Sequence, residues 1–248
     1  MELSPAGARL AVQGGLKFLR DLPRDWDITA IRASIHRFFY QMVIPYMTIY
    51  TRSLGAGATD IGFINSVGMA FAGLLGPFTG TLIDRLGPKR VYLFGITLLT
   101  ACWLTYALAQ SWPVILVAQL AYWMGFETST QGCGVICARN LTRENRATAM
   151  SLCETFATGL LGLGGPTLGG YLVARAGGVS VENIRPLFYI SAVGAALSFI
   201  LILTQLSNRD GGGGARPGFF KGFSDVFKRG KGLKRFLVIS CSLTSRLA

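Results

Sequence analysis

The stretch GTLIDRLGPKRVYLFG, residues 80–95, decides the fold of this chain. A short turn inside it gathers one acid, three basic residues and a glycine: Asp84, Arg85, Gly87, Lys89 and Arg90. Uncharged runs stand on both sides of this turn, over residues 61–83 and 91–126. Because a run of about 20 apolar residues is long enough to cross a bilayer as a helix, the turn predicts a tight loop between two membrane spans.

The composition favours a membrane protein. Of the 248 residues, 51% are hydrophobic and 15% are charged, against about 25% charged residues in an average soluble domain. Residues 155–174 and 186–208 are further uncharged runs. Backbone polar groups inside lipid must be paired within the protein, which a helix achieves alone. The expected fold is therefore an all-α integral membrane protein with six transmembrane helices, over residues 28–51, 61–83, 91–110, 113–137, 147–172 and 186–206.

The regions outside these spans suggest four divisions of the chain. Residues 1–27 form either an amphipathic segment on the membrane surface or a basic tail. Residues 28–206 hold the six-helix bundle. Residues 207–235 form a basic, glycine-rich central loop. Residues 236–248 are apolar but too short to cross a bilayer, so we expect the truncated start of a seventh helix.

Basic residues divide unevenly between the two sides of the predicted membrane. Eighteen Lys and Arg residues lie on the side of the N-terminal tail, and three, Arg52, Arg175 and Arg185, lie on the other. Cytoplasmic loops carry this excess, so the N-terminus is expected in the cytoplasm of a multi-pass protein in the plasma or inner membrane. Anionic lipids would attract these residues, so the net charge of +12 requires no nucleic-acid partner.

Two motifs resemble those of the major facilitator superfamily. The first follows the pattern G-x-L-x-D-R-x-G-x-K-R between spans two and three, and consists of Gly80, Asp84, Arg85, Gly87, Lys89 and Arg90. The second lies in span five and matches the core of a motif typical of the family's proton-coupled antiporters: Gly165, Pro166, Gly169 and Gly170. The resemblance covers residues 28–235. It implies one half of a twelve-helix transporter, with two inverted three-helix repeats and the C-terminal half absent.

Each motif has a functional and a purely structural interpretation. Asp84 at the membrane edge is suited to a contact that latches one side of a rocking transporter, and Gly80 and Gly87 would allow close packing and a sharp turn. The alternative is a plain basic anchor. In span five, glycines beside Pro166 would permit close helix approach and a kink, and the alternative is ordinary packing of small residues.

Charged residues within the spans are candidates for substrate or proton binding. Arg37 lies about 14 Å and Glu127 about 15 Å from the cytoplasmic side at 1.5 Å per residue, which predicts an ion pair. A stripe at steps of four residues faces either a cavity or the bundle: Gln119, Trp123, Glu127 and Gln131.

The roles of the single charged groups stay open at this stage. Glu127 would exchange a proton or bind a cationic substrate. The structural alternatives are a buried ion pair and a protonated, hydrogen-bonded carboxyl group. Glu154 is a second candidate, or a partner of Arg146 or Arg143 near the loop. Arg32 is expected to reach the interface as an anchor. His36, the only histidine, suits either a structural role or a proton relay.

The resemblance implies secondary active transport of a small solute by alternating access, coupled to protons, with drug or metabolite efflux as the expected direction. The sequence offers no catalytic residues, metal ligands or cofactor motif, so no enzyme activity, metal or cofactor is expected. The five cysteines suit small residues of membrane helices. Two alternatives remain: a six-helix half that works as a dimer or with a separate partner half, and a membrane scaffold that does not transport.

Overall fold

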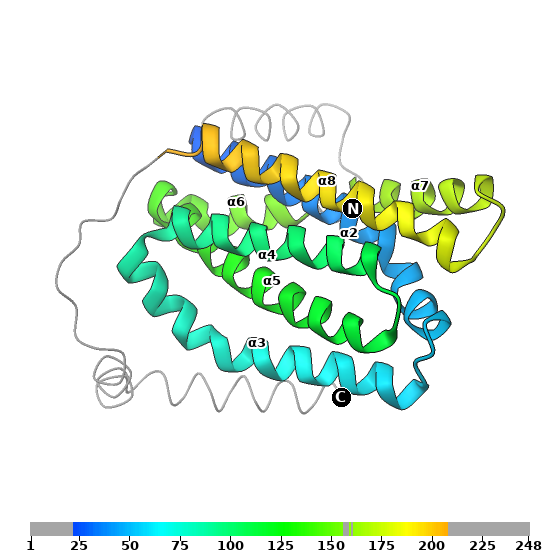
Figure 1. The fold of residues 1–248 in the computed structure, drawn as a ribbon. Coiled ribbons are helices and arrows are strands. Elements are labelled where there is room, and N and C mark those ends of the chain that lie inside the picture. The colour runs from blue at the N-terminus through cyan, green and yellow to red at the C-terminus, as the bar shows by residue number, and fades with distance from the viewer. Residues whose placement is uncertain (1–21, 156–158, 160, 208–248) are drawn as a thin grey trace, which may run out of the picture. The chain divides into compact units, whose positions relative to one another are not determined.

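The computed structural model describes residues 22–155, 159 and 161–207 (Figure 1). This part of the chain contains helices and no strand, which confirms the predicted all-α class. The helices are α2 (Arg24–Ser53), α3 (Ala58–Leu86), α4 (Pro88–Leu108), α5 (Trp112–Asn140), α6 (Arg143–Thr155), α7 (Leu161–Arg175) and α8 (Val181–Gln205). Most of the predicted N-terminal tail, the central loop and the start of a seventh helix lie outside the described residues.

Five predicted spans each coincide with one helix, to within a few residues at either end. The fifth, residues 147–172, covers both α6 and α7, and residues 156–158 and 160 between them lie outside the description. Three of the described helices, α3, α4 and α8, are long and apolar enough to cross a membrane. Length and composition therefore support three of the six expected spans.

Residues with special backbone properties set the helix boundaries. Gly87 has a φ of 84° between α3 and α4, a backbone region that favours glycine. Pro88 then begins α4, where its missing N–H costs nothing. At the start of α3, the backbone N–H of Gly57 donates to the Asp60 carboxylate at 2.8 Å. The turn predicted from residues 80–95 is thus a sharp reversal between two long helices.

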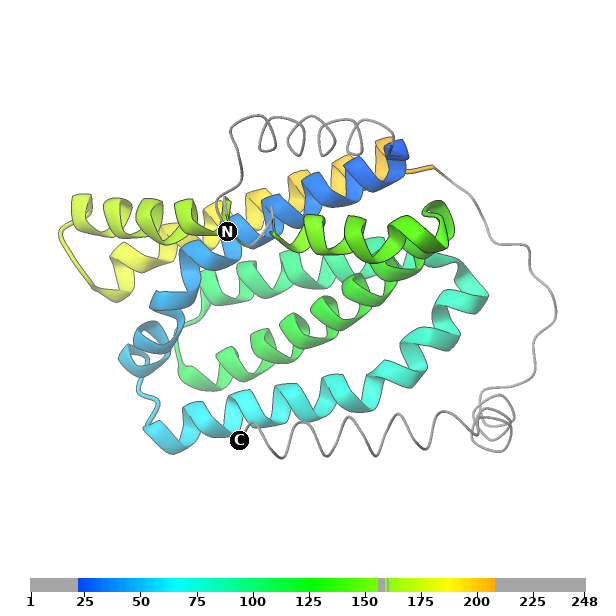
Figure 2. The same cartoon turned by 180° about the vertical axis from the view of Figure 1, so that it is seen from behind.

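The helices pack in a bundle with α4 between α5 and α8 (Figure 1). Helix α2 packs against α7 and α8, and α3 packs against α5 (Figure 2). Helices α4 and α5 cross closely, because a Cβ on Gly95 would lie 2.8 Å from the carbonyl oxygen of Gly125. Small residues at such crossings let helix backbones approach closely. Large aromatic side chains fill the bundle interior beside this crossing, and they are Tyr50, Trp103, Tyr106, Tyr122 and Phe188.

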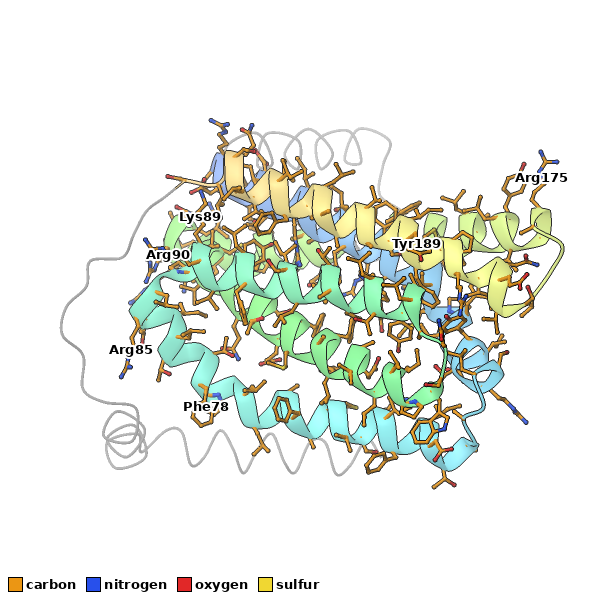
Figure 3. All side chains as sticks on the ribbon, in the orientation of Figure 1. Phe78, Arg85, Lys89, Arg90, Arg175 and Tyr189 are labelled. Carbon is orange, nitrogen blue, oxygen red and sulfur yellow. The ribbon has the colours of Figure 1, made fainter. Side chains whose placement is uncertain are left out.

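The two ends of the bundle differ in charge, as the labelled side chains show (Figure 3). Arg85, Lys89 and Arg90 gather at the end where α3 meets α4, and Arg175 lies at the opposite end. We call the first the basic end. The ends of α5 and α8, at Asn140 and Gln205, also lie at the basic end, so the charged turn and the final turn of α8 are neighbours.

Candidate functional site

A cavity of about 150 Å³ lies between α2, α5 and α6. Charged and aromatic side chains form part of its wall: Arg32, His36, Arg37, Phe126 and Glu154. Cys133, Cys137 and Cys153 add three thiols, and most of the remaining lining is apolar. Two arginines and one glutamate that line one cavity within a bundle of apolar helices make this the candidate functional site.

The cavity contains an ion pair between α2 and α6. Nη2 of Arg37 donates to Oε2 of Glu154 at 3.2 Å. The Arg37 side chain is 29% exposed and that of Glu154 is 72% exposed. Because so much of the carboxylate is open, the pair contributes little to stability, and a solute or proton can reach it.

This ion pair replaces the predicted pair between Arg37 and Glu127. Depth along a helix axis suggested that pair, but depth does not say which way a side chain points around the axis. The second predicted pairing also differs, because Arg146 donates to the backbone carbonyl of Ala138 and not to Glu154. Glu154 is therefore tied to α2 rather than to the nearby loop.

Glu127 lies against α3 instead. Its Oε1 accepts a hydrogen bond from Nε2 of Gln131 at 2.7 Å, and the same amide nitrogen donates to the carbonyl of Gly76 at 3.3 Å. Glu127 is half-buried. Both side chains lie next to Gly76, where an added Cβ would be 3.6 Å from the Glu127 carboxylate, an ordinary contact distance.

The rest of the predicted stripe also packs on α3. Gln119 is 5% exposed; its Oε1 accepts from the Tyr106 hydroxyl at 2.9 Å, and its Nε2 donates to Oδ1 of Asn65 at 3.1 Å. The Trp123 ring lies over Gly68, where an added Cβ would come within 2.3 Å of it. The stripe thus faces the bundle, one of the two directions that its spacing allowed.

Arg32 is buried inside the protein and does not extend to the membrane interface as predicted. It is 5% exposed, and its guanidinium carbon lies 5.0 Å from the centre of the Tyr92 ring. One turn along α2, His36 is half-buried and stacks on Tyr40 with ring centroids 6.1 Å apart. The sequence did not reveal that Arg32 is buried among α2, α4 and α5. This burial at the cavity adds Arg32 to the candidate site.

The span-five motif packs α7 tightly on α2. A Cβ on Gly165 would lie 2.5 Å from the carbonyl oxygen of Phe38, and one on Gly169 would lie 2.5 Å from that of Met42. Pro166 lies within α7, and a Cβ on Gly170 would meet only the Tyr46 hydroxyl, at 3.7 Å. Two of the three motif glycines are therefore required by the close approach of two backbones.

The charged turn contacts the end of α8. Lys89 donates to the carbonyls of Leu203 and Leu206, at 3.1 and 2.7 Å. The last carbonyls of a helix lack partners within the helix, and a lysine can supply them. The negative end of the helix dipole also stabilises a cation at this position. Asp84, Arg85 and Arg90 are exposed. Around Gly80, an added Cβ would meet nothing within 4 Å among the described residues, so close packing does not explain that glycine.

Over the described residues, no group of three or more histidine, cysteine or acidic side chains is arranged to hold a metal ion. Two contributors escaped sequence reasoning: Asn65, which binds Gln119, and the helix-capping role of Lys89. A lone asparagine in an apolar run gives a weak signal, whereas Lys89 stands in a recognised motif whose partner only the fold reveals.

Comparison with known proteins places the chain in a family. A sequence model of the Major Facilitator Superfamily matches residues 29–245. Multidrug resistance protein MdtG of Dickeya zeae is 28% identical over 200 residues, covering 75% of this chain and 46% of that protein. The uncharacterized MFS-type transporter YwoD of Bacillus subtilis is 32% identical over 125 residues, covering 50% of this chain and 26% of YwoD.

A third relative is the quinolone resistance protein NorA of Staphylococcus aureus. It is 23% identical over 165 residues, covering 66% of this chain and 40% of NorA. The chain therefore spans less than half the length of each of these three curated relatives.

Proposed function

Because this chain belongs to the major facilitator superfamily, we propose that it works in secondary active transport. It moves a small solute across the membrane by alternating access and couples the movement to protons. The family and the transporter names of its relatives point to transport and away from enzyme catalysis. The observation that carries the proposal is the ion pair of Arg37 with Glu154 in the cavity between α2, α5 and α6.

The ion pair provides a route for coupling. Charged residues within apolar membrane helices are candidates for a functional role, and the exposed Glu154 carboxylate can be reached by a proton. Protonation of Glu154 would neutralise the carboxylate and release Arg37, which changes the charge that the cavity presents to a solute. A local change of charge can bias two arrangements of a bundle, and α6 would then be free to move relative to α2.

Glu127 is the second carboxylate in the proposal. Its hydrogen bond to Gln131 and its position on Gly76 place it at the contact of α3 with α5. A proton on Glu127 would turn it from an acceptor into a donor and so alter that contact. Gln119 and Trp123 hold the same contact together and would transmit the change along α5.

The charged turn serves as the conformational latch in this account. Lys89 joins the start of α4 to the last carbonyls of α8, so a relative movement of these helices must break two hydrogen bonds. Arg85 and Arg90 are exposed beside it and are available to a second half of the transporter. We propose that this partner is another six-helix unit, because the chain covers less than half of its relatives.

Orientation and direction complete the proposal. The basic end faces the cytoplasm, since the excess of Lys and Arg lies there. Two relatives are named for resistance to drugs, multidrug and quinolone, which favours export of a small molecule. The motif that packs α7 on α2, through Gly165 and Gly169, supports the same direction because of its resemblance to the antiporter motif.

The proposal is tested by measuring proton-driven transport in sealed vesicles that contain the protein as its gene encodes it. A fluorescent quinolone is the first probe, and a pH gradient is the driving force. We expect Glu154→Gln to reduce gradient-driven transport to the background level and Glu127→Gln to reduce it. The matched control is Glu182→Gln, which changes an exposed carboxylate in the first turn of α8 and should leave transport unchanged.

Two results would contradict the proposal. Wild-type rates in Glu154→Gln would remove the ion pair from the mechanism. A probe transport rate that is the same with and without a pH gradient, in the unmodified protein, would contradict proton coupling.

A further inference from the structure

Arg32 is the least explained charge in the molecule. It is 5% exposed, and its Nε has no hydrogen-bond partner. Among the described residues, no carboxylate lies within 4.0 Å of its guanidinium, because the ion pair of the cavity uses Arg37 instead. An unpaired charge is strongly unfavourable in a protein interior, so a fold that keeps one requires a reason.

The ring of Tyr92 does not remove this cost. The guanidinium lies 5.0 Å from the ring centroid, and such a cation–π contact offsets only part of the cost of burying the charge. It leaves the positive charge in place and the Nε hydrogen without an acceptor. The contact instead fixes the position of the guanidinium at the wall of the cavity.

The charges around the cavity do not cancel. Arg32 and Arg37 contribute two positive charges to the wall, and Glu154 contributes one negative charge, which is paired with Arg37. With His36 neutral, the wall of the cavity carries one net positive charge. The chemistry that completes this wall is an anion with two or more oxygens, because a guanidinium presents parallel donors to carboxylate, sulfonate or phosphonate groups.

The size and lining of the cavity describe the rest of the ligand. Its volume of about 150 Å³ is comparable to that of an engineered protein cavity that binds benzene. Phe126 and His36 supply ring faces on one side, and Met150 adds an apolar wall. One aromatic ring that carries an anionic group therefore fits both the space and the charge.

We propose that this cavity binds the anionic group of an aromatic solute, and that Arg32 is the residue that pairs with it. The inference rests on the proposed function in one respect, since it names the class of solute that is transported: small organic anions and zwitterions. Binding itself does not depend on that function and can be measured without transport.

The experiment uses three probes that share one aromatic ring and differ in charge. Benzenesulfonate is anionic, benzenesulfonamide is its neutral analogue, and benzyltrimethylammonium is a cation. Each is titrated into the purified protein, and its binding constant is measured with a radioactive probe. Modification of Cys153 by N-ethylmaleimide, quantified by mass spectrometry of its peptide, reports whether the probe occupies the cavity that this thiol lines. Cys102, buried elsewhere in the bundle, is the internal reference.

We expect benzenesulfonate to bind, to protect Cys153, and to bind roughly 10- to 100-fold more weakly in Arg32→Gln, as for loss of a charge-assisted hydrogen bond. Arg32→Lys keeps the positive charge but loses the parallel donors of the guanidinium, so its affinity for benzenesulfonate should lie between those of the wild type and Arg32→Gln. Arg52→Gln, which removes an exposed arginine in the last turn of α2, should bind as the wild type does.

Three results would overturn the inference: equal binding of sulfonate and sulfonamide, preference for the cation, or unchanged sulfonate affinity in Arg32→Gln. The first two need no variant, so a misfolded Arg32→Gln protein leaves the test intact. Protection of Cys153 without any gradient-driven transport would keep the anion site and reject the proposed function. Proton-driven transport of the quinolone with no sulfonate binding would keep the proposed function and reject the anion site.

Discussion

Replacing Gly169 by alanine tests the packing of α7 on α2. A Cβ at this position would lie 2.5 Å from the backbone carbonyl oxygen of Met42, whereas ordinary van der Waals contact begins at 3.4 Å. The two helices must therefore separate by up to about 0.9 Å at this point. A backbone atom cannot rotate away as a side chain can, so the clash falls in the range of overpacked cores, about 1–3 kcal/mol.

The neighbouring glycine is a matched control. A Cβ on Gly170 would lie 3.7 Å from the Tyr46 hydroxyl, which is an ordinary contact. Both substitutions gain the same helix propensity, about 1 kcal/mol for alanine over glycine. The difference in stability between Gly169→Ala and Gly170→Ala therefore isolates the clash with α2.

The assay is thermal unfolding of the purified protein in detergent, followed by the fluorescence of its four tryptophans. For a chain of this size, 1 kcal/mol shifts Tm by about 2–4 °C. We expect Gly169→Ala to unfold about 2–12 °C below Gly170→Ala. Equal Tm values for the two variants would refute the claim that the motif glycine is required by the approach of α7 to α2.

Three further substitutions are predicted from the same contacts, and thermal unfolding checks each. Lys89→Met should lower stability by about 1 kcal/mol through loss of its hydrogen bonds to α8, while Arg90→Met should not; equal effects would remove the capping role. Gln119→Leu should cost about 1–3 kcal/mol, because it leaves the buried Tyr106 hydroxyl unpaired, and an unchanged Tm would contradict that network. Arg37→Gln should change stability by less than about 1 kcal/mol yet abolish proton-driven transport; a large loss of stability with normal transport would make the ion pair structural.

The positions of the helices along the chain could be predicted from the sequence. Long uncharged runs are required wherever a helix meets lipid, and Gly87 with the charged residues around it identifies the reversal between α3 and α4. The stripe from Gln119 to Gln131 was also readable, because a spacing of four residues places side chains on one helix face. Each of these features is set by residues within a single helix or turn, so the sequence alone is enough to predict it.

Contacts between helices could not be predicted in the same way. Arg37 and Glu127 lie at similar depths, but the stripe turns Glu127 towards α3 and leaves Arg37 with Glu154. The rotation of each helix about its axis depends on glycines such as Gly68 and Gly95, which meet their neighbours only in the fold. The burial of Arg32 has the same origin, since α4 and α5 close over it only after the helices assemble.

The most direct test of the account asks whether the cavity opens to both sides of the membrane in turn. Cys153 lines the cavity beside Glu154, so its thiol reports access. A membrane-impermeant maleimide is applied to right-side-out and to inverted vesicles, with and without a pH gradient, and modification of Cys153 is quantified by mass spectrometry. The account predicts modification from both sides, with the gradient shifting the balance between them. Modification from one side alone under every condition would contradict transport by alternating access through this cavity.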